Sequence, residues 1–144
     1  MRQAIVRQAF IAMLALLGAA FAMTPATALA EKQKVVFQVS DNDPAKWNLA
    51  LNNATNVQTD LGKDNVDIEI VAYGPGLNML KAESKVASRL AQALDKSIGL
   101  MACENTMRNT KTTKADMYSG INYVNAGVTH LMKRQREGWS YIRP

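Results

Sequence analysis

Residues 35–44 read VVFQVSDNDP, and this stretch indicates which fold class the chain adopts. The apolar run Val35–Ser40 predicts a buried strand, which the turn-forming residues after it bring to an end. Pro44 suits the first position of a helix, and Asp43 is a suitable N-cap in front of it. A strand that passes directly into a helix is the repeating unit of α/β proteins, so we expect that fold class.

The same unit recurs along the chain. Apolar residues at helical spacing predict helices from Pro44 until Gly62, from Ser84 to Lys96 and from about Val128 to Glu137. Short apolar runs predict further strands at Val66–Tyr73, Ser97–Ala102, Ile121–Val124 and Trp139–Ile142. This alternation predicts a three-layer α/β/α domain with a mainly parallel five-stranded sheet and right-handed crossovers.

Four polar or glycine-containing segments directly follow a predicted strand. They are Ser40–Asp43, Gly74–Gly76, Cys103–Thr106 and Asn125–Gly127. The ends of parallel strands share the carboxyl edge of the sheet, where open parallel sheets place their ligand sites. Cys103 is therefore expected at an edge suited to chemistry, and the strand order decides which of these segments are its neighbours.

The first thirty residues have the features of an export signal. Arg2 and Arg7 give a positive start, the stretch Ala9–Met23 is uncharged and apolar, and Ala28–Ala30 has the small-x-small pattern of a cleavage site. We expect cleavage after Ala30 and a periplasmic mature protein with a single domain over residues 31–144. A retained membrane anchor is less favoured, because the apolar run is shorter than the roughly 20 residues that cross a bilayer.

The charge balance narrows the class of partner. The formal net charge of the chain is +5, which includes Arg2 and Arg7 of the leader. This mild basicity favours anionic small molecules or an acidic partner slightly, but nucleic acid binding requires a basic patch with aromatic residues among it. No such patch is present in the sequence, and the run Lys133–Arg136 is expected to be a solvated helix face.

Cys103 is the only cysteine of the chain, within the sequence MACENT, so no intramolecular disulfide can form. The residue is either a nucleophilic or sulfur-carrying thiol, or a buried cysteine that packs like alanine at the end of a strand. A useful thiolate needs positive potential from a helix start or from cations. Arg108, Lys111 and Lys114 follow closely, and Glu104 opposes them.

Other candidate residues lie in the segments at the carboxyl edge. Asn105 and Thr106 are expected to cap or stabilise the turn after Cys103, and in a second interpretation they hold its loop in place. Gly74 and Gly76 flank a proline in a tight turn, with an anion-cradling loop as the less favoured alternative.

The helix predicted near the C-terminus carries two further candidates. Gln135 shares a stripe with Val128, Leu131 and Met132, which is expected to face inward, so its amide must hydrogen-bond to a loop, a ligand site or a subunit contact. His130 lies on the opposite side of this helix and is expected to face solvent. Neither a Cys–His catalytic pair nor a metal site is therefore expected.

From about Lys34 to Pro144 the chain resembles the DsrE/DsrF-like family of small sulfur-metabolism proteins. The most specific parts are ACENTM at residues 102–107 and the closing stretch from NAGV at 125–128 through QREGWSYIRP at 135–144. The resemblance implies a compact α/β/α subunit that assembles into trimers or hexamers, with the cysteine near a pocket or subunit contact. In this superfamily a cysteine carries sulfane sulfur as a persulfide between proteins, and Cys103 is the position that would inherit this role.

Two functions from different classes follow. In the first, a periplasmic protein binds or relays sulfane sulfur as a persulfide on Cys103, while Asn105 and Thr106 position the loop and Arg108 favours the thiolate and an anionic donor. The second is a non-enzymatic oligomeric module that binds a small ligand or a partner at the carboxyl edge, with a packed cysteine.

The expected partners are further copies of the chain and a protein that donates or accepts sulfur. We do not expect the protein to bind nucleic acid or to stay inserted in a membrane after cleavage. We also expect neither a metal nor an organic cofactor. The sequence leaves open whether the protein is an enzyme such as a sulfurtransferase. Another hydrolase or oxidoreductase activity is not expected, because the sequence lacks a second cysteine and a well-placed histidine base.

Overall fold

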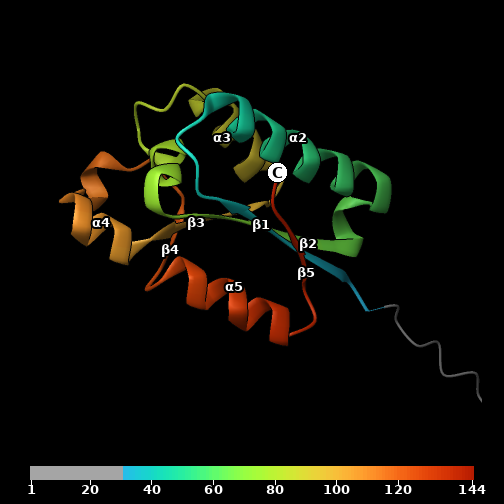
Figure 1. Ribbon diagram of the computed structural model, residues 1–144. Coiled ribbons are helices and arrows are strands. Elements are labelled where there is room, and N and C mark those ends of the chain that lie inside the picture. The colour runs from blue at the N-terminus through green and yellow to red at the C-terminus, as the bar shows by residue number, and fades with distance from the viewer. Residues whose placement is uncertain (1–30) are drawn as a thin grey trace, which may run out of the picture. The chain divides into compact units, whose positions relative to one another are not determined.

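The computed structural model describes residues 31–144, and the expected signal peptide lies outside the described residues. Five strands form one sheet in the order β4-β3-β2-β1-β5, and every neighbouring pair is parallel (Figure 1). The strands are β1 (Gln33–Val39), β2 (Val66–Ala72), β3 (Gly99–Cys103), β4 (Asn122–Val124) and β5 (Ser140–Ile142). The predicted α/β fold with a five-stranded parallel sheet is confirmed.

Helices cover both faces of this sheet. They are α2 (Pro44–Leu61), α3 (Ala87–Asp95), α4 (Glu104–Thr110) and α5 (Gly127–Arg136), with short 3₁₀ segments η1 (Lys63–Asn65), η2 (Gly74–Leu80) and η3 (Lys114–Asp116). Figure 1 shows α2 and α3 on one side of the sheet and α5 on the other. Among residues 31–144, no helix is both long and apolar enough to span a membrane.

The first strand and helix form as the opening sequence predicts. The Asp43 carboxylate accepts a hydrogen bond from the Ala45 N–H at 2.8 Å, which satisfies one of the free donors at the start of α2. Pro44 occupies the first helical position. At the other end, Gly62 has a φ of +90°, a conformation that glycine adopts without steric cost, and the helix stops there.

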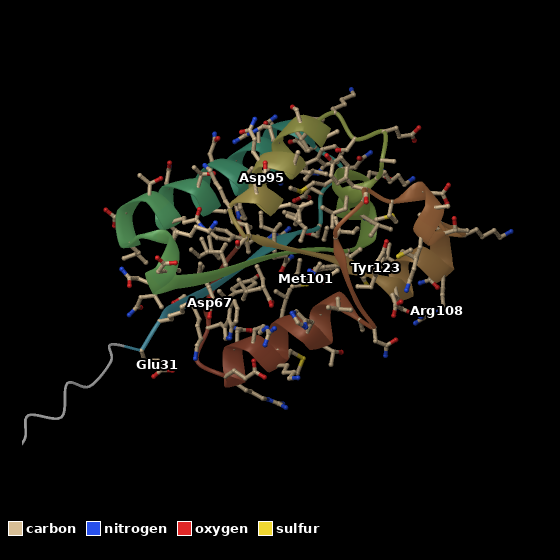
Figure 2. The ribbon with its side chains drawn as sticks, turned by 180° about the vertical axis from the view of Figure 1, so that it is seen from behind. Glu31, Asp67, Asp95, Met101, Arg108 and Tyr123 are labelled. Atoms are coloured by element: carbon tan, nitrogen blue, oxygen red, sulfur yellow. The ribbon has the colours of Figure 1, made fainter. Side chains whose placement is uncertain are left out.

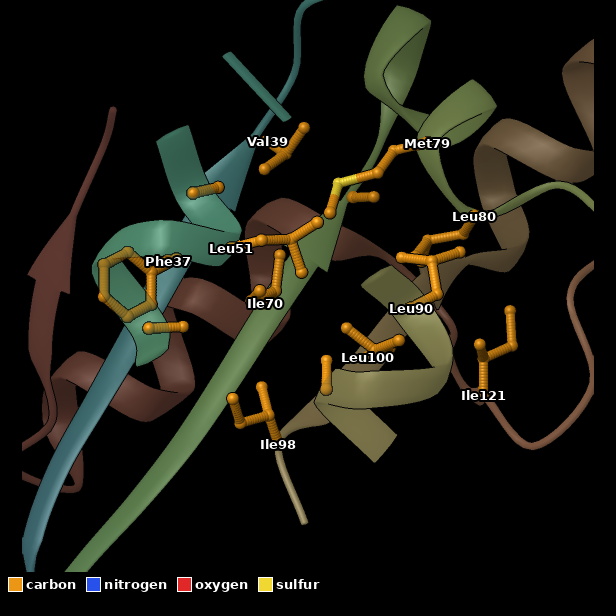
Figure 3. Close-up of a cluster of buried hydrophobic side chains, with 14 of the residues drawn as sticks. Phe37, Val39, Leu51, Ile70, Met79, Leu80, Leu90, Ile98, Leu100 and Ile121 are labelled. Atoms are coloured by element: carbon orange, nitrogen blue, oxygen red, sulfur yellow. The ribbon is translucent and has the colours of Figure 1, made fainter. Parts of the chain in front are cut away.

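The main hydrophobic core lies between the sheet and the layer of α2, α3 and η2. Phe37 on β1, Ile70 on β2 and Leu100 on β3 are fully buried on this face (Figure 3). Leu51 from α2 and Leu90 from α3 pack against them. Burial of each such side chain contributes about 1.5–3 kcal/mol, so this layer provides most of the apolar stabilisation.

The opposite face has a much smaller core. Its buried members are Val36, Val71 and Leu131, with Met101 and Trp139 partly buried beside them. Figure 2 shows Met101 between the sheet and α5. Within residues 31–144 a single helix covers this face, so few apolar contacts fix the position of α5.

The orientation of α5 corrects one prediction. Of the residues expected to face inward, Leu131 is buried, but Val128 is 52% exposed, Met132 is 49% exposed and Gln135 is also exposed. His130, expected in solvent, instead faces the sheet, and so does Arg134 from the run expected to be a solvated face. The reason is a buried carboxylate on β2, Glu69, which requires partners that only this helix supplies.

Two local elements also differ from the sequence prediction. Residues Glu104–Thr110 form the helix α4, where the sequence analysis expected a turn after Cys103. Gly74–Leu80 continues from the predicted tight turn into the 3₁₀ helix η2, which buries Met79 and Leu80 in the main core. Both elements begin at the carboxyl edge of the sheet, and they meet where the Gly74 N–H donates to Thr106 Oγ1.

Candidate functional site

Cys103 is the last residue of β3 and the N-cap of α4. Its neighbours at the sheet edge are the ends of β2 and β4, because β3 lies between these two strands. The residue is only 4% exposed, so the sulfur lies just beneath the surface of the carboxyl edge. The position agrees with the edge expected from the sequence.

The starts of two helices meet at the Cys103 sulfur. The backbone N–H of Thr106, in the first turn of α4, donates to Sγ with an N···S distance of 3.4 Å. The N–H of Gly127, the first residue of α5, donates to the same sulfur at 3.2 Å. Unpaired N–H groups at a helix start carry partial positive charge and favour an anion.

These contacts change the acidity of the thiol. Burial raises the pKa of Cys103, but hydrogen bonds from the Thr106 hydroxyl and from the N–H groups of Gly127, Thr106 and Asn105 lower it by more. The net pKa lies below the ordinary value for cysteine. Hydrogen bonds to the ionised sulfur therefore favour a thiolate in spite of burial.

The side chain of Thr106 joins the cysteine loop to the end of β2. The Gly74 N–H donates to Thr106 Oγ1 at 2.9 Å, which leaves the hydroxyl hydrogen free for the Cys103 sulfur. Gly74 has a φ of +53°, which favours glycine at that position. Asn105 joins the same segment to the end of β4. Its N–H donates to the carbonyl of Asn125, the residue directly after β4, at 3.0 Å.

The other predicted site residues lie at different distances from this centre. A Cβ on Gly76 would collide with the Val39 carbonyl, so this glycine permits η2 to pack against the end of β1. Arg108 is exposed on α4 (Figure 2), with Nη2 at 3.4 Å from Asn105 Oδ1 and 3.5 Å from Asn125 Oδ1.

The other predicted site residues, two lysines and Gln135, do not contact the Cys103 sulfur by hydrogen bonds. Lys114 pairs with Glu104 at 3.6 Å and lies over the Tyr123 ring at 4.5 Å. Lys111 is exposed at the C-terminal end of α4. Gln135 lies two turns along α5 from Gly127 on its exposed surface, so the structure does not bring it to Cys103.

Tyr73 is a neighbour of the sulfur that the sequence analysis did not identify. Ala72 on β2 pairs with Ala102 on β3, so the next residues, Tyr73 and Cys103, lie side by side at the edge. Tyr73 also packs against Gly127, where an added Cβ would lie 3.0 Å from Tyr73 Cβ. Burial raises the pKa of the Tyr73 phenol, which therefore stays protonated at neutral pH. The strand order and register carry this information, and neither is visible in a single segment.

The surface cavities found among residues 31–144 are not lined by Cys103. One of about 360 Å³ is lined by residues that include Trp47, Asn78 and Lys81, and one of about 440 Å³ by residues that include Lys81, Lys111 and Asp116. Cys103 lines neither of these two cavities.

Comparisons with known proteins agree with this fold. A model of the DsrE/DsrF-like family matches residues 33–144. The protein of unknown function MTH1491 from Methanobacterium thermoautotrophicum is 34% identical with a TM-score of 0.75, over 78% of this chain and 100% of that one. The conserved protein of unknown function BT1422 from Bacteroides thetaiotaomicron shares the fold at 15% identity and a TM-score of 0.59, over 78% and 95% of the two chains. No curated protein matches the chain.

Proposed function

The chain belongs to the DsrE/DsrF-like family, a family of the sulfur-relay type, and from this membership we propose that it binds or relays sulfane sulfur as a persulfide on Cys103. One observation carries the proposal. The Cys103 sulfur accepts hydrogen bonds at the starts of both α4 and α5, and these bonds favour its ionised form. A thiolate is the form that attacks a sulfane sulfur atom.

The chemistry requires no outside oxidant or reductant. The Cys103 thiolate attacks the outer sulfur of an anionic donor such as thiosulfate or polysulfide, and a new S–S bond forms on Sγ. The donor's own S–S bond breaks, and its electron pair leaves with sulfite or with the shortened polysulfide. An acceptor thiolate then attacks the outer sulfur of the persulfide and releases Cys103 as the thiolate. Neither a metal nor an organic cofactor takes part.

The residues around Cys103 support these steps in different ways. Thr106 and Asn105 hold the loop through Gly74 and Asn125, so the sulfur keeps its donors. Arg108 is exposed at the same edge and provides a positive charge for an anionic donor. Cys103 is 4% exposed, so a donor reaches the sulfur when the neighbouring loops open slightly.

The setting of the protein is part of the proposal. Export through the leader of residues 1–30, with cleavage after Ala30, would place the domain in the periplasm. Assembly into trimers or hexamers is proposed from the family resemblance, and light scattering on the purified mature protein tests it. A mass of a single subunit at working concentration would contradict the assembly.

The burial of Cys103 favours a second candidate, a non-enzymatic oligomeric module that binds a small ligand or partner at this edge. In that case the thiol packs and does not react. A loading and release experiment distinguishes the two functions. The mature protein is incubated with polysulfide, freed of excess reagent and mixed with a small thiol, and released sulfane sulfur is then measured.

The sulfur-carrier proposal predicts about one released sulfur atom per chain for the wild type and none for Cys103→Ser. Equal release from both proteins, or none from either, would reject the carrier and favour the binding module. Thr110→Val is a suitable second control, because Thr110 lies on α4 without contact to the sulfur.

A further inference from the structure

The position of α5 decides whether Cys103 keeps one of its hydrogen bonds. The Gly127 N–H that donates to the sulfur belongs to the first residue of this helix. Yet few apolar contacts are fully buried there: Leu131 of α5 meets Val36 and Val71 of the sheet, with Tyr73, Met101 and Trp139 partly buried beside them. Val128 and Met132 on the same helix are 52% and 49% exposed, so they bury little apolar surface within the subunit. Another interaction must fix the helix on the sheet.

The buried carboxylate of Glu69 provides that interaction. Glu69 is 6% exposed on β2 and accepts hydrogen bonds from Arg134 Nη2 at 2.6 Å and from Arg134 Nε at 2.9 Å. His130 Nε2 lies 2.7 Å from Glu69 Oε2 and donates the third bond, since the carboxylate can only accept. Every partner of this carboxylate lies on α5. A buried charge without these partners would be strongly destabilising, so the cluster specifies where the helix sits.

Further contacts fix the Arg134 and Glu69 side chains in one arrangement. Arg134 Nη1 also donates to Glu137 Oε2 at 2.7 Å, and its guanidinium lies 4.6 Å from the centre of the Trp139 ring. On the sheet side, a Cβ on Gly99 would lie 3.2 Å from Glu69 Cγ, so the glycine provides room for the acidic side chain. The two-pronged contact of an arginine with a carboxylate fixes orientation as well as distance.

The contacts of His130 with Glu69 lie within one turn of Gly127, so they also fix the start of α5 beside Cys103. His130 is three residues after Gly127, which is about 4.5 Å along the helix axis. The His130 N–H donates to the Ala126 carbonyl at 3.0 Å, so the first turn is closed. Tyr73 packs directly against Gly127 and stops the helix start from approaching the sheet further.

We propose that Glu69 is a positioning residue, which through His130 and Arg134 holds the start of α5 within hydrogen-bond distance of the Cys103 sulfur. The inference rests on the proposed role of Cys103 as a reactive thiolate. Glu69 itself does not touch the sulfur or any substrate.

The sign of the effect separates positioning from simple charge. Removal of the Glu69 negative charge, which leaves Arg134 paired with Glu137 alone, would by charge favour the thiolate and speed its reaction. Loss of the Gly127 hydrogen bond would do the opposite. The other charged and titratable groups beside Cys103 are Glu104 and Arg108 on α4 and Tyr73 directly after β2, and they stay the same in every variant.

The experiment measures the rate of alkylation of Cys103 by iodoacetamide as a function of pH, on the mature protein. Glu69→Ala removes the anchor, and Glu69→Gln keeps its shape and part of its hydrogen bonding without the charge. The matched control is Asp67→Ala, which removes a carboxylate on the same strand and face. The Asp67 side chain is 46% exposed and pairs with Lys32 at 3.2 Å.

Positioning predicts that Glu69→Ala raises the apparent pKa of the rate profile by about one, since one hydrogen bond to the thiolate is lost. At a pH well below both apparent pKa values the thiolate fraction then falls about tenfold, but a more basic thiolate is a better nucleophile, so the rate there falls about three- to fourfold. Glu69→Gln should lie closer to the wild type, and Asp67→Ala should match it.

A Glu69→Ala rate at or above that of the wild type, with an unchanged or lowered apparent pKa, would overturn the inference. If circular dichroism shows that Glu69→Ala does not fold, Glu69→Gln decides instead: slower alkylation supports positioning, and a rate at or above that of the wild type refutes it. Alkylation does not require sulfur transfer. A profile that depends on Glu69 in a protein that never accepts sulfur would therefore reject the proposed function and keep this inference.

Discussion

Replacement of Thr106 by valine tests how the thiol is activated. The valine keeps the shape of threonine but removes the hydroxyl, which accepts from the Gly74 N–H at 2.9 Å and hydrogen-bonds the Cys103 sulfur. A hydrogen bond to an ionised group contributes about 1.5–3 kcal/mol, and 1.36 kcal/mol corresponds to one pKa unit. Bonds to sulfur are long, so we take the lower end and expect the pKa of Cys103 to rise by about one.

The same substitution should also lower stability, because the Gly74 N–H loses its acceptor. A net loss of about 1 kcal/mol is expected for a part-buried hydrogen bond. The pKa is measured from the pH dependence of alkylation, and the free energy of unfolding from urea denaturation.

Thr110→Val is the matched control for this experiment. Thr110 lies one turn further along α4 and bonds the Thr106 carbonyl at 2.9 Å, without contact to the sulfur. It should change stability slightly and leave the pKa of Cys103 as it is. If Thr106→Val gives the same rate profile as the wild type, the hydroxyl does not lower the pKa and our account of the thiolate is wrong.

Three further substitutions test other parts of the account. Gly127→Ala would place a Cβ 3.0 Å from Tyr73 Cβ and push α5 away from the Cys103 sulfur. We expect the free energy of unfolding to fall by about 1–3 kcal/mol, measured by urea denaturation, and alkylation of Cys103 to slow. Asp43→Ala should cost about 1 kcal/mol in urea denaturation through loss of the α2 cap, and an unchanged midpoint would contradict it. Hydrogen bonds with Thr113 lower the pKa of Asp116, so the ionised Asp116 stabilises the fold until the pH falls through that lowered pKa. In thermal melts at decreasing pH, Asp116→Asn should therefore lose less stability than the wild type.

The order of secondary structure could be predicted because its signals are local. The apolar run at Val35 and the Asp43-Pro44 start of α2 each specify one element without reference to the rest of the chain. Repetition of that unit leaves few topologies, and the parallel sheet follows. Element bounds differed by a few residues, as at Ser84 in the predicted helix against Ala87 in α3.

The features missed near the site depend on contacts across the fold. The helix α4 has Cys103 as its N-cap, and cysteine is not among the residues that usually signal a helix start. The face of α5 was assigned from its apolar residues, but the buried Glu69 on β2 selects His130 and Arg134 instead. Tyr73 becomes a neighbour of Cys103 only through strand order and register. Single-segment patterns contain none of this information.

The most direct test of the central claim is the intact mass of the mature protein after exposure to thiosulfate or polysulfide, before and after treatment with a reductant. We predict a gain of one or more sulfur atoms on the wild type, lost on reduction and absent from Cys103→Ser. A wild-type mass that does not change, in a folded protein whose thiol also resists alkylation, would contradict the claim that Cys103 carries sulfur.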